Sequence, residues 1–320
     1  MGTQTRSGTA RGLLGLLAET AVHAGVGTQI GAVDLPIQRE RHTGWPTIYG
    51  SGLKGVLRDE ARKAGWQDEE IKAVFGPEPE RPGEARESEE RRAGVLAISD
   101  ARILLFPVRT AGMAFAWITC PLALARLARD AEHAGLRELP SVPGTPEVGK
   151  RVLVVPRWPG RDRGAFIEEF VYDAPPSEGL ERLADWISRH LMPTAPPYGY
   201  WREQLGRALA LVHDDDFTDF ARHATEIVTR VRLKDDWKTV EGGAPWTEEH
   251  LPPDTLLYAF AVAWRSDGGA PQSVRTPGAV MQRLGELIET QAVIQIGGKE
   301  TVGRGFVALR LAGGGDGQAQ

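Results

Sequence analysis

The chain has 320 residues, of which 41% are hydrophobic and 25% charged, a composition typical of an ordinary soluble globular protein. It has no apolar run of the roughly 18 to 20 residues that a transmembrane helix requires, and its polar, Gly/Thr-rich start lacks the apolar core of a signal peptide. The single cysteine, Cys120, excludes an intrachain disulfide and a cysteine zinc cluster. We therefore expect a cytoplasmic protein without membrane contact.

The net charge of −5 argues against a nucleic-acid partner when it is taken as an average, because phosphate binding needs local positive potential. The charge is, however, segregated along the chain. Residues 34–63 carry six Lys or Arg and four acids, a net charge of +2, whereas residues 66–92 carry five Lys or Arg and nine acids, a net charge of −4. One face of the protein is therefore expected to be able to bind an anion.

The first third of the chain is predicted to contain a buried strand, a long loop and two short helices. We expect these elements at residues 13–20, 21–50, 51–65 and 68–76. Ser51 is positioned to cap the first helix and Gly65 to end it. Residues 77–92 are rich in Pro, Glu and Arg, which indicates a mobile acidic surface loop. A loop as long as 21–50 within a compact domain is often functional.

Strands and helices are mixed in the remainder. Strands are predicted at 95–106, 114–120, 152–155, 165–172, 208–212, 225–233, 256–264, 292–296 and 306–311, and helices at 121–135, 179–191, 214–224 and 277–291. A strand–helix–strand start, paired antiparallel strands in the middle and a helix–strand–loop–strand end indicate an α+β fold. We expect a split βαβ, ferredoxin-like core that carries large insertions.

Two glycine-rich loops are candidates for anion binding. In residues 50–55, GSGLKG, a glycine turn opens a helix whose free N–H groups and positive end, together with Lys54, suit a phosphate. In residues 297–305, GGKETVGRG, glycines permit close backbone approach while Lys299 and Arg304 supply charge. Each loop alone is explained as well by a plain helix entry or a hairpin turn. The first is not a P-loop, so we predict no nucleotide triphosphatase.

Asp34 is an isolated carboxylate among small and apolar residues. A turn or capping aspartate is the usual explanation. The alternative is a loop carboxylate that takes a proton or binds a hydrated divalent cation, and a site of this kind needs substrate phosphates to complete it. RNA would supply both these phosphates and its own 2′-hydroxyl nucleophile. His23 and His42 lie on either side as candidate acids or bases, or as ordinary loop histidines.

Trp237 and Trp246 lie in a polar segment between two predicted strands. Exposed aromatic side chains stack on unpaired bases. Such residues also pack on a neighbouring subunit or beneath their own loop, and the sequence leaves both explanations open.

Several segments together resemble the backbone RAMP subunit of the Cmr complexes, the type III-B CRISPR effectors. They are ETAVHAGVG, GAVDLPIQRERHTGWPTIYGSGLKGVLRDEAR, FGPE, ISDARILLFPVRT and IQIGGKETVGRGFV. The resemblance runs in order from about Gly12 to Leu311 and is thin between Gly144 and Trp201. The DLPIQRERHTG block is specific to this subunit, whereas the C-terminal glycine loop is shared more widely among RAMP proteins.

The resemblance implies a single RAMP domain over residues 1–320, ordered from 12 to 311. Its fold would be a modified RRM-like palm with inserted subdomains and an extended β-hairpin thumb at 230–253. Copies would stack into a helical filament along a CRISPR guide RNA, and each thumb would interrupt the guide–target duplex at regular intervals. The implied partners are guide RNA, target RNA, further copies of the chain, and other Cmr subunits, including the small subunit and the large polymerase-like subunit.

The resemblance also assigns site residues within the active loop, 21–50. Asp34 corresponds to the catalytic aspartate and His23 to the loop histidine. The expected RNA contacts are Gln38, Arg39, Arg41, Ser51, Gly52, Lys54, Arg58, Gly297, Gly298, Lys299 and Arg304. Trp237 and Trp246 fall in the thumb segment, whose residues differ between members, so they are predicted RNA contacts from their aromatic character and not from the resemblance. The implied activity is a metal-dependent endoribonuclease that uses Mg²⁺ or Mn²⁺ at Asp34, as metal ligand or general base, and leaves a cyclic phosphate and a 5′-hydroxyl. A backbone subunit with an idle active loop is the alternative.

Overall fold

A computed structural model of the chain describes residues 8–28, 31–78, 93–146, 149–231, 245–266 and 269–316. Most of the predicted acidic loop, 77–92, lies outside these ranges, and so does Trp237. Within these ranges, no helix is long and apolar enough to cross a membrane.

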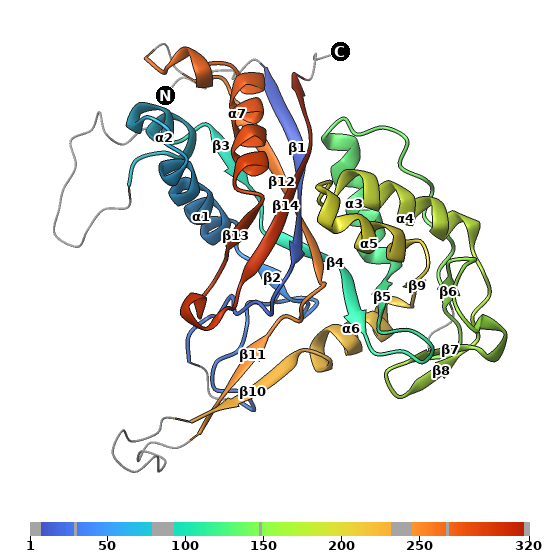
Figure 1. Ribbon diagram of the computed structural model, residues 1–320. Coiled ribbons are helices and arrows are strands. Elements are labelled where there is room, and N and C mark those ends of the chain that lie inside the picture. Colours follow the sequence, from blue (N-terminus) through green and yellow to red (C-terminus); the bar gives the residue numbers. More distant parts are fainter. Residues whose placement is uncertain are drawn as a thin grey trace.

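Six elements form the core of the molecule in the order βαββαβ (Figure 1). They are β1 (Thr9–Ala18), α1 (Gly50–Lys63), β4 (Ala101–Val108), β12 (Leu256–Trp264), α7 (Pro277–Thr290) and β14 (Phe306–Asp316). The strands lie in the order β14-β1-β12-β4, and each neighbouring pair is antiparallel. This order is that of a split βαβ fold, so the predicted ferredoxin-like, RRM-like palm is confirmed.

The first strand occupies the centre of the core sheet. Leu14 pairs with Ala259 of β12 on one side and with Leu311 of β14 on the other. Because both edges and both faces of β1 are covered, nearly all of its residues are buried, which explains the apolar run read from the sequence.

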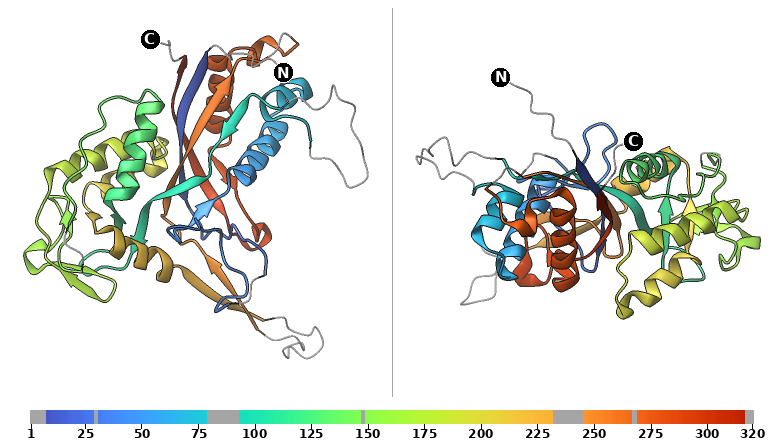
Figure 2. Two further views of the ribbon diagram at one scale, coloured as in Figure 1. Left: turned by 180° about the vertical axis from the view of Figure 1, so that it is seen from behind. Right: turned by 90° about the horizontal axis from the view of Figure 1, so that it is seen from above.

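A subdomain inserted between β4 and β12 extends the sheet through β5, β9 and β6 (Figure 2). Its elements are β5 (Ala116–Thr119), α3 (Pro121–His133), β6 (Leu153–Val154), η2 (Arg161–Arg163), β7 (Ala165–Ile167), β8 (Phe170–Tyr172), α4 (Glu178–His190), η3 (Pro196–Tyr198), α5 (Gly199–Leu205), β9 (Leu209–Leu211) and α6 (Asp214–His223). The same insertion ends with a separate hairpin of β10 (Glu226–Arg230) and β11 (Trp246–His250), which points away from the sheet in Figure 1.

Smaller elements complete the fold and show where local prediction was wrong. They are β2 (Thr47–Ile48), α2 (Asp68–Phe75), β3 (Leu96–Ile98), η4 (Gln272–Val274), β13 (Val293–Gln295) and η5 (Glu300–Val302). The single strand predicted at 95–106 is split into β3 and β4, and helix α5 was missed. Ser51 does not cap α1. The helix begins at Gly50, whose N–H donates to Asp100 Oδ1 at 2.8 Å and where a Cβ would lie 2.4 Å from the Ile98 carbonyl oxygen.

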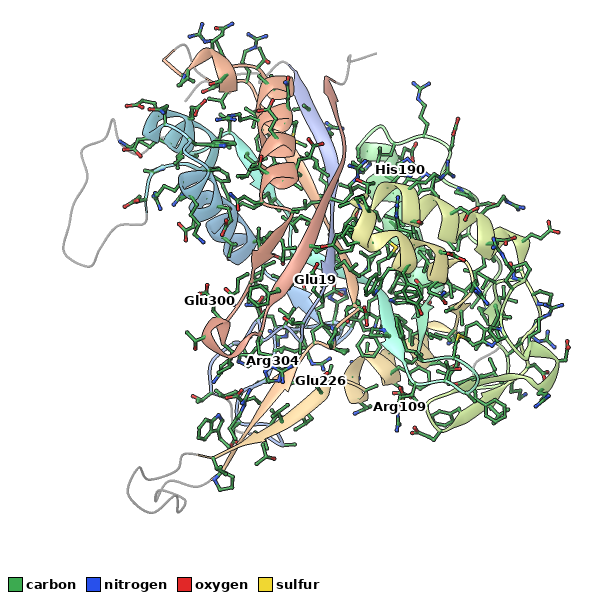
Figure 3. All side chains as sticks on the ribbon, in the orientation of Figure 1. Glu19, Arg109, His190, Glu226, Glu300 and Arg304 are labelled. Atoms are coloured by element: carbon green, nitrogen blue, oxygen red, sulfur yellow. The ribbon has the colours of Figure 1, made fainter. Side chains whose placement is uncertain are left out.

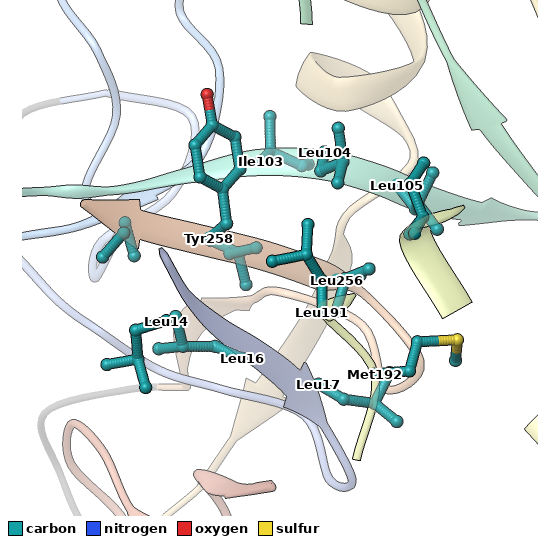
Figure 4. Packing of buried hydrophobic residues seen from close by; sticks show 14 of the residues in the cluster. Leu14, Leu16, Leu17, Ile103, Leu104, Leu105, Leu191, Met192, Leu256 and Tyr258 are labelled. Carbon is teal, nitrogen blue, oxygen red and sulfur yellow. The ribbon is translucent and has the colours of Figure 1, made fainter. Parts of the chain in front are cut away.

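Helices cover both faces of β1. Gly12 and Gly15 point to opposite faces of the strand: a Cβ at Gly12 would lie 3.0 Å from Met281 Cε of α7, and one at Gly15 would lie 2.0 Å from the Leu191 carbonyl oxygen. Leu191 and Met192 follow α4 and pack with side chains of β1, β4 and β12 (Figure 4). The end of α4 therefore touches β1 so closely that only glycine fits at position 15.

We expect Gly15→Ala to lower the free energy of unfolding by about 1–3 kcal/mol, because the end of α4 would have to move. Gly55→Ala is the matched control, since Gly55 lies inside α1 with no atom within 4 Å of the added Cβ. That change should stabilise the protein by about 0.5–1 kcal/mol. Urea denaturation of both variants measures the difference, and equal stabilities would contradict the close approach.

Candidate functional site

The loop 21–50 packs against the hairpin and the C-terminal glycine loop. Val22 forms an isolated β-bridge with Leu251, and Leu35 forms one with Glu248 of β11. His23 forms a third bridge with Gly298. Segments that are more than 200 residues apart in sequence thus meet at the base of the hairpin.

Asp34 lies in a segment that runs parallel to β11, and Thr247 holds it there. The Leu35 N–H donates to the Thr247 carbonyl oxygen at 3.0 Å. The Thr247 N–H and hydroxyl both donate to Asp34 Oδ2, at 2.7 and 2.8 Å, while the Asp34 N–H donates to Thr247 Oγ1 at 3.0 Å. The two bonds from Thr247 lower the pKa of the exposed Asp34 carboxyl. Asp34 is therefore ionised at neutral pH, and its Oδ1 accepts no hydrogen bond from another described residue.

Glu248 is fully buried and joins the hairpin to the C-terminal glycine loop. Its Oε1 accepts hydrogen bonds from Lys299 Nζ at 2.6 Å and from Trp246 Nε1 at 2.7 Å, while Arg230 Nε lies 3.4 Å from Oε2. Burial alone would raise the pKa of Glu248, but the bonds from Lys299 and Trp246 and the two nearby cations outweigh it and lower the pKa. Two predicted RNA contacts, Lys299 and Trp246, are thus bonded to a buried carboxylate.

Glu249 is also buried, and it fixes the active loop. It accepts hydrogen bonds from the Ile37 N–H at 3.1 Å and from Arg39 Nη2 at 2.5 Å. Arg39 Nη1 donates in addition to the carbonyl oxygens of Gly44 at 2.6 Å and Ala221 at 3.0 Å. The Arg39 guanidinium is therefore directed into the protein, which favours a structural role over the predicted contact with RNA.

His23 is buried beside a second histidine, which the sequence did not suggest. Its Nδ1 lies 2.7 Å from the Glu249 carbonyl oxygen, which only accepts, so Nδ1 carries the proton and Nε2 remains an acceptor. The His23 ring lies 5.3 Å from that of His250. Burial, followed by the proximity of His23 and Arg304, lowers the pKa of His250 to about 4, so His250 is neutral at pH 7. Both of its ring nitrogens are buried without a hydrogen bond within the described ranges.

The glycines of the C-terminal loop support His23. Gly297 has φ +84°, and a Cβ there would lie 2.3 Å from the His23 carbonyl oxygen. The Gly298 N–H donates to that same oxygen at 3.0 Å. The loop therefore needs glycine for its approach to the active loop, whatever its contact with RNA.

Three further predicted site residues also make internal contacts. Arg58 Nη2 donates to the Phe75, Gly76 and Pro77 carbonyl oxygens at 2.8–3.2 Å, at the end of α2. Gln38 Oε1 accepts from the Tyr49 N–H at 2.7 Å, immediately before α1. Arg304 Nη1 lies 3.6 Å from Glu226 Oε2, at the start of the hairpin (Figure 3). His42, the other candidate acid or base, is exposed and contacts Arg126 at 3.0 Å.

Four predicted RNA contacts remain directed at solvent or near it. Arg41 is exposed and pairs with no acid among the described residues, and Ser51 and Gly52 are exposed in the first turn of α1. No acidic residue lies in that turn. Lys54 is half-buried, and burial together with the charge of Arg58 lowers its pKa. This end of α1 therefore offers free N–H groups and a partly desolvated ammonium to an anion.

The base of the hairpin is less exposed than its sequence indicates. Its first strand, β10, begins at Glu226, within the strand predicted at 225–233. At its base, Glu248, Glu249 and His250 are buried, although a polar sequence of this kind indicates a solvated projection. These three residues belong to the site beneath the hairpin and not to a free thumb.

Arg39→Ala should lower the free energy of unfolding by about 1–3 kcal/mol, because it leaves the buried Glu249 carboxylate without its cation. Arg41→Ala, two positions away and exposed, should change it by less than about 0.5 kcal/mol. Urea denaturation midpoints decide the point. If both variants were as stable as the native protein, the internal contacts of Arg39 would contribute nothing to the free energy of unfolding. The prediction that Arg39 contacts RNA would then stand.

The palm with its projecting hairpin and glycine loop defines an RRM-like RAMP fold, and the comparison with known families agrees. This chain belongs to the RAMP superfamily, whose family model matches residues 16–308. It is 36% identical over 308 residues to the CRISPR system Cmr endoribonuclease Cmr4 of Pyrococcus furiosus, with 93% of this chain and 95% of that protein covered. It is 23% identical to the CRISPR system CMR subunit Cmr4 of Saccharolobus solfataricus, covering 92% and 94%.

Solved structures show the same fold. The crystal structure of oligomeric Cmr4 from Pyrococcus furiosus matches with a TM-score of 0.71 and 29% identity, over 96% of this chain and 99% of that one. A chain of the type III-B Cmr-beta complex bound to cognate target RNA matches with a TM-score of 0.66 and 21% identity, over 94% and 96%. At that identity the second likeness supports the fold alone.

Proposed function

We propose that this chain is an RNA-binding backbone subunit of a type III-B Cmr effector complex and that it cleaves target RNA as an endoribonuclease. The observation that carries the proposal is the Asp34 carboxylate, which is exposed and ionised and is fixed by one oxygen at the base of the hairpin. The relative named as an endoribonuclease, 36% identical over nearly the whole chain, supports it. A turn aspartate would need no such support from a residue 213 positions away.

The lowered pKa of Asp34 favours one of its two expected roles. An efficient general base has a pKa near the working pH, whereas Asp34 holds its proton less tightly than an ordinary aspartate. We therefore assign Asp34 the role of cation ligand. His23 Nε2 is the better candidate for taking the 2′-hydroxyl proton, because Nδ1 is bonded to the Glu249 carbonyl oxygen and only a glycine at position 25 leaves space beside Nε2.

A divalent ion, Mg²⁺ or Mn²⁺, would stabilise the negative charge that develops on the phosphate. The described residues contain no group of three or more His, Cys, Asp or Glu side chains placed to hold a metal. Asp34 Oδ1 would thus be the protein ligand that the described residues offer, and water and RNA phosphate oxygens would fill the other positions, as Mg²⁺ prefers. This donor set suits an ion that is bound together with RNA.

The RNA groove is proposed to follow the predicted contact residues whose side chains form no hydrogen bond or ion pair with another described residue. The N–H groups of Ser51 and Gly52, with Lys54 and Arg41, would bind phosphates of the guide RNA. The hairpin would separate guide–target base pairs next to Asp34. The partners are then guide RNA, target RNA, further copies of the chain in a filament, and other Cmr subunits, including the small and the large polymerase-like subunits.

Lys54→Ala should weaken guide binding and lower the slope of log affinity against log salt by about 0.7, the value for one phosphate contact on a single strand. Lys63→Ala is the control, because Lys63 lies at the other end of α1 and is bonded to Glu60 at 2.8 Å. Binding of guide RNA across a salt series measures both slopes. An unchanged slope for Lys54→Ala would place the groove elsewhere.

Asp34→Asn should reduce target cleavage in Mg²⁺ by about a hundredfold or more while guide binding and assembly stay unchanged. The amide keeps an oxygen to accept the bonds from Thr247 but loses the charge. Asp185→Asn, an exposed aspartate of α4, is the matched control. Cleavage of matched target RNA by assembled complex is the measurement. If the Asn variant cut at the native rate, the chain would be an RNA-binding backbone with an idle loop.

A further inference from the structure

Among the described residues, Thr247 of the hairpin makes the side-chain hydrogen bonds that orient the Asp34 carboxylate. Its N–H and its hydroxyl both donate to Oδ2, at 2.7 and 2.8 Å. Its hydroxyl oxygen in turn accepts the Asp34 N–H at 3.0 Å. The Thr247 hydroxyl therefore donates one hydrogen bond and accepts another. It cannot rotate without breaking one of the two.

This arrangement determines which carboxylate oxygen meets the RNA. Both bonds from Thr247 end on Oδ2, so Oδ1 is the oxygen left for a ligand. Without the hydroxyl, Oδ2 would keep one donor, and the carboxylate could turn about its last side-chain bond. A carboxylate that supplies a single bond to its ligand depends on such orientation, because no second protein ligand corrects an error in its position.

The register of the hairpin places Thr247 opposite Asp34. The buried carboxylates of Glu248 and Glu249 bond to Lys299 and Arg39, on two different segments, so β11 cannot slide by one residue without breaking both. A slip of one residue would also present Trp246 or Glu248 to Asp34 in place of the hydroxyl. The position of the carboxylate is therefore set by the strand of the hairpin and not by its own loop.

We infer that Thr247 is a positioning residue for the cleavage reaction: its hydroxyl fixes Asp34 Oδ2 so that Oδ1 faces the scissile phosphate. The inference rests on the proposed endoribonuclease function, but it concerns a different residue and a separate measurement. It makes the hairpin strand part of the cleavage site. The competing explanation is that a β-branched residue at 247 merely suits a strand.

Two substitutions separate these explanations, because they rank the variants in opposite orders. Thr247→Val keeps the shape and the β-branch but removes the hydroxyl, whereas Thr247→Ser keeps the hydroxyl and removes the methyl group. Positioning predicts that Val lowers the cleavage rate of the assembled complex about tenfold or more, while Ser stays within about threefold. A strand role predicts that Val is the better substitute. Thr194→Val is the control, since Thr194 is exposed in the inserted subdomain and lies outside the hairpin, the active loop and the glycine loop.

A second readout does not depend on activity. In the isolated chain, the pKa of the Asp34 carboxyl is measured by NMR titration of ¹³C-labelled aspartate, with Asp34→Asn to assign the signal. We expect the pKa to rise in Thr247→Val and to stay close to the native value in Thr247→Ser, since loss of a bond to the ionised form raises a pKa. An unchanged pKa in the Val variant would overturn the inference.

The combined outcomes distinguish the two proposals. If native complex and Asp34→Asn cut equally well, or if neither cuts, the proposed function fails, and the titration still decides whether Thr247 holds the carboxylate. If Asp34→Asn is inactive while Thr247→Val cuts at the native rate, the function stands and the positioning role is overturned. Loss of cleavage in Val with recovery in Ser, together with the raised pKa, supports both.

Discussion

Strand β11 is the element on which the rest of the site depends, because three successive residues of it bind two separate segments, the active loop and the glycine loop. Thr247 bonds to Asp34, Glu248 to Lys299, and Glu249 to Ile37 and Arg39. Side chains of a strand alternate between its two sides, so Thr247 and Glu249 serve the active loop while Glu248 serves the glycine loop. The carboxylates of Glu248 and Glu249 are buried and would be costly to leave without a partner. Loss of one of these contacts is therefore expected to disturb the others.

A protein of net charge −5 can bind RNA if a few available cations lie together. The contacts of the basic residues show which of them are available. Arg39, Arg58 and Lys299 are bonded to groups of the protein itself, so they add little positive potential for an external anion. Arg41 and Lys54 are left, next to the free N–H groups of α1. A single copy would then hold few phosphates, and a filament of copies would gain its affinity by repeating the same short contact along one RNA.

The fold could be predicted from the sequence because its signals are local. The apolar run of β1, the helical period of α7 and the proline and glycine that bound α3 depend on neighbours in the chain, and together they indicate the βαββαβ order. Asp34 could be singled out as an isolated acid between apolar and turn residues, but its catalytic role came from the family resemblance and stays a prediction. What could not be predicted was the partner of each charge. Arg39 and Glu249 are 210 residues apart, and no local pattern distinguishes a cation that bonds to a buried acid from one that bonds to RNA.

The burial of the residues at the base of the hairpin could not be predicted for the same reason. The stretch from Thr247 to His250 is polar, and polarity in a strand normally indicates exposure to water. Here Glu248 Oε1 and both carboxylate oxygens of Glu249 accept hydrogen bonds, most of them from residues that only the folded chain brings near. His250 had no motif to mark it, and its burial follows from the two loops that close over the strand.

The pairing of β1 with β14, at opposite ends of the chain, has a consequence for synthesis on the ribosome. The central strand is made long before its neighbour β14, so this pairing cannot form until residues 306–316 have left the exit tunnel. Contacts of such long range slow folding, and domains generally fold as units during synthesis. Asp34 is translated early but acquires its hydrogen bonds only when Thr247 follows, and the glycine loop closes later still. A nascent chain would therefore carry Asp34 without its hydrogen bonds until Thr247 has been made and the hairpin has formed.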